Sequence, residues 1–476
     1  MPIPILASAL QDGVEVIPGW EYIKNYGPIA VSVFLLKNYF AGSRNTWEMN
    51  FHGRVFIVTG GTSGLGASVV DELASKGAQL VLLVKNLHDE WVIDYVEGLR
   101  EKHGNQLIYA EECDLNSLHS IRMFVSSWLN SRNPRRLDGV VLCAGESLPI
   151  GKPRQLSADG VEKQIAINYL ANYHLLTLLA PAIRSQPSDR KVKILTTSCL
   201  SQVFGNVDLE DLLWEDRKYP SNTPWKVFGT SKLMLSCFVK EYQRRLDTYE
   251  RSDKTSMSVR ANIVNPGMMR SPSTKRFLSL GSIFGLMMYV LLYPILWIFL
   301  KSTYQGAQSF FYALSNPELN VRPGGSFIQE CSVVQKKTKK ELNDEEFQKK
   351  LYEETEKLIN DIEKRSATRR NQSSTAANKK NKKKGKKQPA KKDEKEPEKP
   401  GISLMQTKGD ALERELSKMD KTLPLFGDFS GNAPKSKENK YLKALDAKFE
   451  AQLASRNQAK TTSTEVTTEK PKSRKI

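Results

Sequence analysis

The chain has 476 residues and a formal net charge of +18. Residues 331–476 hold 37 Lys and Arg against 23 Asp and Glu, a net charge of +14, so most of the basic character belongs to the C-terminal part. The five cysteines include no CxxC pair and the five histidines are scattered. This pattern argues against a disulfide framework and against a metal site, and it predicts free thiols in a reducing compartment.

The N-terminal segment, 1–49, is expected to lie near a membrane. It lacks the basic start, apolar core and small-residue cleavage site of a signal peptide. An apolar run over 29–36 ends at Lys37 and is too short to span a bilayer. Aromatic residues on both sides (Trp20, Tyr22, Tyr26, Tyr39 and Phe40) are typical of a helix at a membrane interface. A helix packed on the folded domain is the alternative, and both remain open.

A strand, a glycine-rich loop, a helix and a second strand follow one another between residues 55 and 84. The strands are expected over 55–58 and 79–84, and the helix over 67–76 with Gly77 as its C-cap. The loop reads Thr59-Gly60-Gly61-Thr62-Ser63-Gly64-Leu65-Gly66. Its glycines let backbone amides and a helix N-terminus approach a pyrophosphate, and the strand–loop–helix order favours this function over a turn without a ligand.

The T-G-x-x-x-G-x-G spacing resembles that of the short-chain dehydrogenase/reductase family, in particular its retinol-dehydrogenase-like members. Further matching segments follow in family order: Asp114-Leu115 after Cys113, Ala144-Gly145 at a strand end, Ile167-Asn168, and Asn265-Pro266-Gly267 through Ser271. Two Asn residues that the family carries before Ala144 are replaced by Leu142 and Cys143. The resemblance implies an α/β Rossmann fold over 50–335, with a doubly wound parallel sheet, in which these segments bind a nicotinamide cofactor.

Lys85 directly follows the second expected strand. Family members that prefer NADP(H) carry a basic residue at this position, where a cation can pair with the 2′-phosphate, whereas an acidic residue favours NAD(H). The resemblance therefore favours NADP(H) over NAD(H). A solvated lysine with no ligand is the alternative.

The family's catalysis uses an Asn-Ser-Tyr-Lys tetrad, in which the Tyr hydroxyl exchanges a proton with the substrate oxygen. Tyr and Lys are four residues apart because one helical turn places both on the same face. Lys232 and Asn168 match their family positions, but Phe228 stands at the Tyr position, and no tyrosine in the chain precedes a lysine by four residues. Cys199 stands at the Ser position unless the register slips by one residue to Ser198.

A phenylalanine has no exchangeable proton, and positioned proton transfer contributes about 10²–10⁴-fold to a rate. The sequence therefore predicts that the family's usual reaction is severely impaired, unless Tyr219 reaches the site from a loop. Two functions remain. One is a membrane-associated protein that binds NADP(H) and acts as a scaffold or sensor, and the other is an active NADP(H)-dependent oxidoreductase of a lipid alcohol or carbonyl.

Residues 277–300 contain no charged side chain, and Lys275, Arg276 and Lys301 bracket them. One continuous helix would extend ~36 Å, enough to span a bilayer. However, a last strand is expected over 325–329, so the chain must leave and re-enter the domain on the same side. Pro294 and two glycines favour a bent, partly inserted segment that anchors the domain beside the substrate entrance. A buried core helix is the alternative.

Residues 336–476 are expected to form a basic, low-complexity tail. It contains one amphipathic helix over 340–365, a disordered stretch over 369–400 and two short amphipathic stretches over 411–419 and 441–453. The densest basic run, 379–387, fits a solvated linker first and an anionic-lipid contact second. RNA contact, which lacks interleaved aromatics, and a nuclear signal come after these. Positive-inside reasoning predicts a cytosolic core and tail, at the endoplasmic reticulum membrane or a lipid-droplet surface.

Overall fold

The computed structural model describes residues 19–131, 135–251, 253–335 and 339–384, with side chains up to residue 372, and the single residues 13 and 15. The expected stretches over 411–419 and 441–453, and part of the basic run over 379–387, lie outside the described residues.

An eight-stranded sheet, ordered β3-β2-β1-β4-β5-β6-β7-β8, forms the centre of the described chain. All neighbouring strands run parallel except β7 and β8. The order reverses between β1 and β4, where a doubly wound sheet opens a crevice at the carboxyl ends of its strands. The predicted fold class is confirmed. The strands are β1 (Val55–Thr59), β2 (Gln79–Val84), β3 (Ile108–Glu112), β4 (Gly139–Leu142), β5 (Lys193–Thr197), β6 (Arg260–Asn265), β7 (Phe327–Gln329) and β8 (Ser332–Val334).

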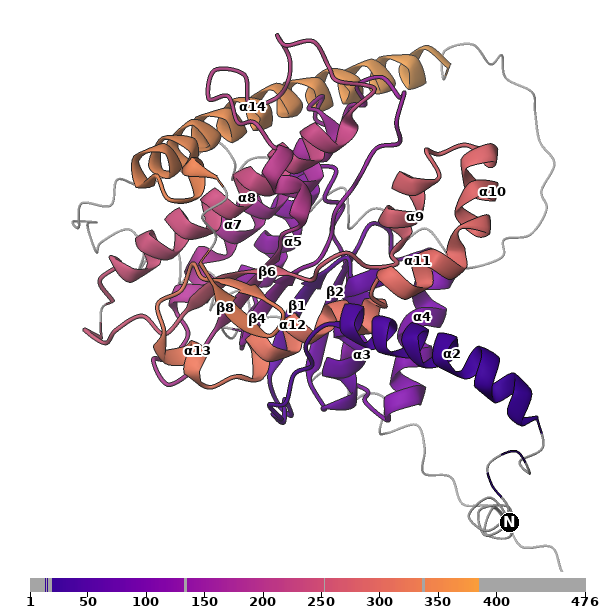
Figure 1. The fold of residues 1–476 in the computed structure, drawn as a ribbon. Helices are drawn as coiled ribbons and strands as arrows, with labels where there is room; N and C mark the ends of the chain where they lie inside the picture. Colours follow the sequence, from indigo (N-terminus) through magenta and orange to yellow (C-terminus); the bar gives the residue numbers. More distant parts are fainter. Residues whose placement is uncertain are drawn as a thin grey trace, which may run out of the picture. The chain divides into compact units, whose positions relative to one another are not determined.

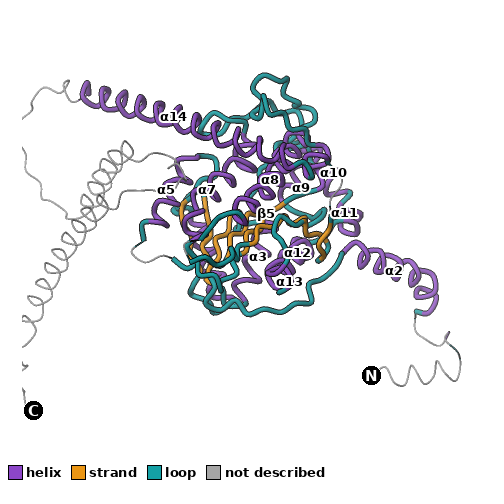
Figure 2. Tube along the Cα trace, turned by 90° about the vertical axis from the view of Figure 1, so that its left-hand side faces the viewer, coloured by secondary structure: helices purple, strands orange, loops and turns teal. Residues whose placement is uncertain are grey.

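Helices cover both faces of the sheet, as Figures 1 and 2 show. Strand residues alternate between two apolar cores, so that Ile57 packs in one core and Phe56 and Val58 in the other. This alternation explains why the central strands β1, β2 and β4 are almost entirely apolar, because each has buried side chains on both faces. One core is covered by α3 (Gly64–Ser75), α4 (Glu90–His103) and α12 (Thr303–Ser315), and the other by α5 (Leu118–Leu129), α7 (Ala171–Arg184) and α8 (Pro224–Asp247).

The apolar segment 277–300 is broken into short helices, α9 (Pro272–Leu278), α10 (Ile283–Leu291) and α11 (Tyr293–Phe299). A β-bridge between Met269 and Lys301 closes the excursion, so the chain leaves and returns at neighbouring points, as predicted. Only Gly285 in these helices is buried, so the alternative of a core helix is wrong. Within the described residues, no helix combines the length and apolar character needed to cross a bilayer.

The N-terminal apolar run belongs to α2 (Trp20–Ala41), in which only Ala41 is buried. The C-terminal end of α2 lies beside α11, where the rings of Phe40 and Phe299 meet edge to face at 4.9 Å. The helix therefore contacts the domain, but it leaves most of its apolar side chains exposed.

The amphipathic helix expected over 340–365 is present as α14 (Glu345–Lys384), after the short helix η4 (Lys340–Leu342). The expectation of disorder from residue 369 is wrong over 369–384, which continue the helix, and residues 385–400 lie outside the described residues. It packs on α8 and α7: the Tyr352 ring lies 5.1 Å from that of Tyr173 and 5.9 Å from that of Phe238. Leu351 and Ile362 are buried in the same core. The folded unit therefore extends past the expected boundary at 335, because α14 carries an apolar stripe that the charged composition of this region conceals.

Candidate functional site

The glycine loop lies between β1 and α3 and approaches the end of β4 closely. Gly60 has a φ of +65°, and a Cβ added there would lie 2.7 Å from Ala144 Cα. A Cβ on Gly66 would lie 2.1 Å from the Gly60 carbonyl oxygen. The hydroxyl of Thr59 accepts a hydrogen bond from the backbone N–H of Ala144 at 3.3 Å. The loop can keep this shape only with glycine at 60 and 66, which is the cradle that a pyrophosphate requires.

The N-terminus of α3 faces the crevice with its first turn uncapped. The Ser63 side chain accepts no hydrogen bond from the helix, and the first backbone bond runs from Ala67 N to Ser63 O. Helix amides without internal partners are suited to an anion. Gly64 begins the helix, and a Cβ there would lie 3.3 Å from Pro272 and 3.8 Å from Ser271. The segment from Pro266 to Ser271 therefore ends beside the glycine loop.

The remaining cofactor positions also lie at the carboxyl ends of the strands. Lys85 is exposed directly after β2 and makes no ion pair within the described part of the chain. Asp114 follows β3 and accepts a hydrogen bond from Asn116 N at 2.9 Å, while Leu115 packs partly on the core. Gly267 follows β6 with a φ of +78°, and its N–H donates to Asn265. The structure thus places these residues at the same end of the parallel sheet.

Lys232 and Asn168 meet at the ends of β4 and β5. Lys232 is buried on α8 and its Nζ donates to the carbonyl oxygen of Thr197 at 3.1 Å. Burial lowers the pKa of Lys232 below its usual value. A Cβ added to Gly145 would lie 3.4 Å from Asn168 Oδ1 and 3.5 Å from Lys232 Nζ. The two tetrad residues that match the family therefore converge on Gly145.

Asn168 is held by partners that the sequence did not indicate. Its amide accepts from Glu146 N at 2.7 Å and donates to Glu146 O at 2.9 Å and to the Ser231 hydroxyl at 3.1 Å. It lies on η2 (Ala166–Leu170), a π-helical turn between α6 (Lys163–Ile165) and α7. Glu146 acts through its backbone, so its residue type carries no signal. Ser231 is next to Lys232 in the sequence, so it was the one partner of Asn168 that could have been predicted from its position.

Phe228 occupies the place of the family's tyrosine. It is on α8, one turn before Lys232, and the Lys232 Nζ lies 5.8 Å from the centre of its ring. The contact is of the cation–π kind, and it offers Lys232 no hydroxyl partner. Proton transfer at this position is therefore impossible for Phe228 itself.

Ser198 and Cys199 differ in burial and in their hydrogen-bond partners. Ser198 is buried and its hydroxyl donates to the Gln202 side chain at 2.8 Å. Cys199 is more exposed, contacts the Ser201 hydroxyl, and lies close enough to Lys232 for a charge on its sulfur to raise the lysine pKa. Both residues follow the end of β5, and the Ser198 backbone N–H donates to the Val264 carbonyl oxygen at 2.8 Å. The assignment of Cys199 to the family's Ser position stays a prediction.

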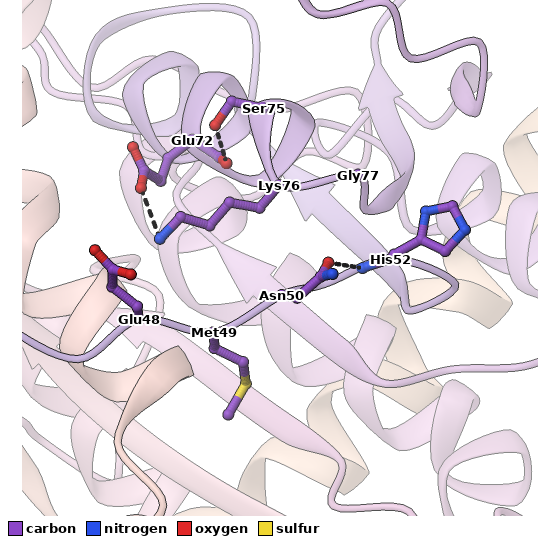
Figure 3. A pocket seen from close by; sticks show the side chains of 8 residues that line it. All are labelled: Glu48, Met49, Asn50, His52, Glu72, Ser75, Lys76 and Gly77. Atoms are coloured by element: carbon purple, nitrogen blue, oxygen red, sulfur yellow. Dashed lines mark hydrogen bonds and ion pairs between the residues drawn. The ribbon is translucent and has the colours of Figure 1, made fainter.

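Two further features lie away from this centre. The Tyr219 hydroxyl donates to Glu162 at 3.0 Å and accepts from Gln164 at 3.3 Å, so it does not serve as the missing donor. Figure 3 shows a hollow beside the amino ends of β1 and β2, opposite the end of the sheet that carries Lys232. It is lined by Glu48, Met49, Asn50, His52, Glu72, Ser75, Lys76 and Gly77.

Comparison with known proteins gives a consistent picture. Residues 54–207 match the family model described as short chain dehydrogenase. The chain is 44% identical to an uncharacterized oxidoreductase of Saccharomyces cerevisiae, over 79% of this chain and 96% of that protein. It is 29% identical to human retinol dehydrogenase 13, over 70% and 92%, and 29% identical to mouse polyprenol dehydrogenase, over 63% and 82%.

Proposed function

Because the chain belongs to the short-chain dehydrogenase family, we propose that it is a membrane-associated NADP(H)-binding protein whose usual proton transfer is impaired and which acts as a scaffold or sensor. One observation carries the proposal: a phenyl ring faces Lys232 where the reaction needs a hydroxyl. The glycine cradle is complete, whereas the groups that would complete a reaction are not.

The chain's own residues fit a nicotinamide dinucleotide. Gly60, Gly64 and Gly66, with the uncapped first turn of α3, would hold the pyrophosphate. Lys85 would meet the 2′-phosphate, which favours NADP(H) over NAD(H). When bound, the cofactor supplies or accepts a hydride. Asn168 and Lys232 would line the end of the site where that transfer occurs.

The impairment follows from two missing hydroxyls. A carbonyl that accepts a hydride also needs a proton, and Phe228 cannot donate one. Cys199 is a weaker hydrogen-bond donor than the serine whose position it takes, so it orients a carbonyl less well. Loss of positioned proton transfer alone lowers a rate by about 10²–10⁴-fold. Binding without efficient turnover is the behaviour expected of a sensor of cofactor state.

An active oxidoreductase of a lipid alcohol or carbonyl is the second candidate. The apolar segment begins beside the crevice: Arg276 pairs with Glu146 at 2.9 Å, and Phe277 meets Trp225 at 6.0 Å. Such a lobe suits a long apolar substrate, and two relatives are named for retinol and polyprenol. In this case Lys232 or water would have to supply the proton.

A membrane location belongs to the same proposal, with the folded core on the cytosolic side of the endoplasmic reticulum or on lipid droplets. It is supported by the exposed apolar side chains of α10 and α11. Extraction of the protein from cell membranes by a high-salt or carbonate wash would contradict it.

Steady-state kinetics test the main proposal. Detergent-purified full-length protein is mixed with NADPH and a panel of long-chain aldehydes and ketones, and NADPH oxidation is followed at saturating cofactor. We expect oxidation about 10²–10⁴-fold slower than at ordinary enzymatic rates, because positioned proton transfer is lost. Oxidation at ordinary enzymatic rates of about 1–10³ s⁻¹ would contradict impairment and establish the second candidate.

A further inference from the structure

Large apolar side chains are exposed on α2, α10 and α11, which come from opposite ends of the folded chain. Six of them, Phe34, Tyr39, Ile283, Phe284, Met287 and Leu291, are each between 67% and 82% exposed. Contiguous apolar exposure of this kind marks an interaction site. We call the exposed apolar side chains of these three helices the α2–α11 surface.

Direct contacts join the two parts of this surface. Lys37 Nζ on α2 donates to the carbonyl oxygens of Trp297 at 2.6 Å and Leu300 at 3.2 Å, at the end of α11. The same ammonium lies 4.9 Å from the centre of the Trp297 ring. With the edge-to-face pair of Phe40 and Phe299, these contacts hold α2 against α11, and Figure 1 shows the helices side by side.

A strained turn at the edge of the sheet contacts both the C-terminal end of α2 and the end of the apolar segment that carries α10 and α11. Glu330 and Cys331, which connect β7 to β8, both have a φ of +51°, a conformation that costs free energy for residues other than glycine. The Glu330 carboxylate pairs with Lys301, where the apolar segment returns, and accepts from Ser43 N at 3.0 Å, just after α2. One carboxylate therefore ties both segments to the same point.

The segment that carries α10 and α11 has only cationic charged side chains, of which Arg276 and Lys301 pair with Glu146 and Glu330. Residues 265–317 contain four Lys and Arg and no Asp or Glu. Arg270 donates to the Tyr293 hydroxyl at 3.3 Å, and its buried Nε has no partner in the described structure. Burial lowers the pKa of Lys37, and the positive charge of Arg270 lowers it further. Two close cations beside apolar helices are complementary to the phosphates of a lipid surface.

We propose that the α2–α11 surface docks on an anionic bilayer, with apolar side chains of both α2 and α10–α11 entering the interface and Lys37 and Arg270 meeting lipid phosphates. No described helix spans a bilayer, so these helices lie in the interfacial plane. The inference rests on the membrane location proposed above and adds to it the second helix and the preference for anionic headgroups.

Vesicle flotation of the purified full-length protein tests this inference. We compare vesicles of phosphatidylcholine alone with vesicles that also contain phosphatidylserine, and we expect tighter binding to the second. Phe34→Glu on α2 and Leu291→Glu on α10 should each weaken partitioning at least about tenfold, because each places a charge in the interface. Trp91→Glu is the matched control: Trp91 is 55% exposed on α4, outside the surface, and its substitution should change nothing.

The headgroup preference is tested by Arg270→Gln, because Lys37 also holds α2 against α11. This variant should reduce the advantage of phosphatidylserine and leave binding to neutral vesicles nearly unchanged. NADPH binding measured on every variant shows that the fold is retained. Wild-type binding by Phe34→Glu, with loss in Leu291→Glu, would overturn the composite surface but leave the membrane location standing. The wild-type protein could instead fail to float and form a dimer that Leu291→Glu dissociates. That result would overturn both the composite surface and the membrane location, and it would show that a second copy of the chain covers the α2–α11 surface.

Discussion

The glycine loop at the start of α3 and the first turns of α8 face the same crevice. The loop keeps the features that the family's reaction needs, whereas the α8 side lacks some of them. The loop depends on backbone shape: Gly60 and Gly66 leave no room for a Cβ. The α8 side depends on single side-chain atoms, and there Phe228 and Cys199 lack the hydroxyls that the reaction uses. Nucleotide binding and proton transfer are thus separable properties of one fold, and each predicts its own experiment.

The largest expected effect is on the glycine loop. Gly66→Ala places a Cβ 2.1 Å from the Gly60 carbonyl oxygen, so the backbone that we propose holds the pyrophosphate must move. We expect NADPH affinity to fall about 100-fold, or roughly 2.7 kcal/mol. Isothermal titration measures it, with circular dichroism to verify folding. Gly98→Ala on α4, where a Cβ meets nothing within 4 Å, is the control, and equal affinity in both variants would show that the loop is not the cofactor site.

The second effect concerns the α8 side. Phe228→Tyr combined with Cys199→Ser restores both hydroxyls within reach of Lys232. We expect the turnover number for a carbonyl substrate to rise about 100-fold, since positioned proton transfer contributes 10²–10⁴-fold. Phe228→Leu combined with Cys199→Ser, which restores only the serine, should not show this gain. If NADPH binds equally to all three proteins and turnover never improves, something other than the missing tyrosine limits the reaction.

A smaller effect is expected at Lys85. Lys85→Glu replaces a cation by an anion at the proposed 2′-phosphate contact, so the ratio of NADPH to NADH affinity should fall about tenfold, or 1.4 kcal/mol. Lys191→Glu is the control, because Lys191 is an exposed lysine just before the amino end of β5, whereas Lys85 follows the carboxyl end of β2. Parallel titrations with both nucleotides measure the ratio. An unchanged ratio would assign Lys85 to solvent, which is the alternative that the sequence left open.

The smallest effect concerns α14, which supports the turn that carries Asn168. The hydroxyls of Thr355 and Tyr169 hydrogen-bond at 2.7 Å in the buried interface. Thr355→Val should lower the free energy of unfolding by about 1 kcal/mol, without a change in NADPH affinity, because the glycine loop is distant in the fold. Urea unfolding measures it, with Thr368→Val, exposed on the same helix, as the control. Equal stabilities of the two variants would show that α14 is not coupled to this turn.

Much of the site could be predicted because its signals are local in sequence. The glycine spacing, the Phe228–Lys232 pair and the strand ends each occupy a few consecutive residues, and the topology of the sheet then brings them together. The contacts that could not be predicted join distant segments or use the backbone. Asn168 is held by the peptide groups of Glu146, and α2 meets α11 about 260 residues later in the chain.

The same reasoning explains two other outcomes. Ser198 is more buried than Cys199 in the structure, and the hydrogen bond from the Ser198 N–H to Val264 of β6 joins segments too distant in sequence to be predicted. The attachment of α14 needed the aromatic cluster of Tyr173 and Phe238, which receives Tyr352. From its charged composition alone, this helix is expected in a separate tail.

One measurement tests the separation of binding from proton transfer most directly. NADPH and NADH are titrated into the wild-type full-length protein and followed by nicotinamide fluorescence, and a long-chain aldehyde is then added to the saturated complex. The account predicts saturable binding of NADPH, tighter than that of NADH, and fluorescence that stays constant after the aldehyde is added. Absence of binding by either nucleotide, or rapid loss of fluorescence on addition of the aldehyde, would contradict it.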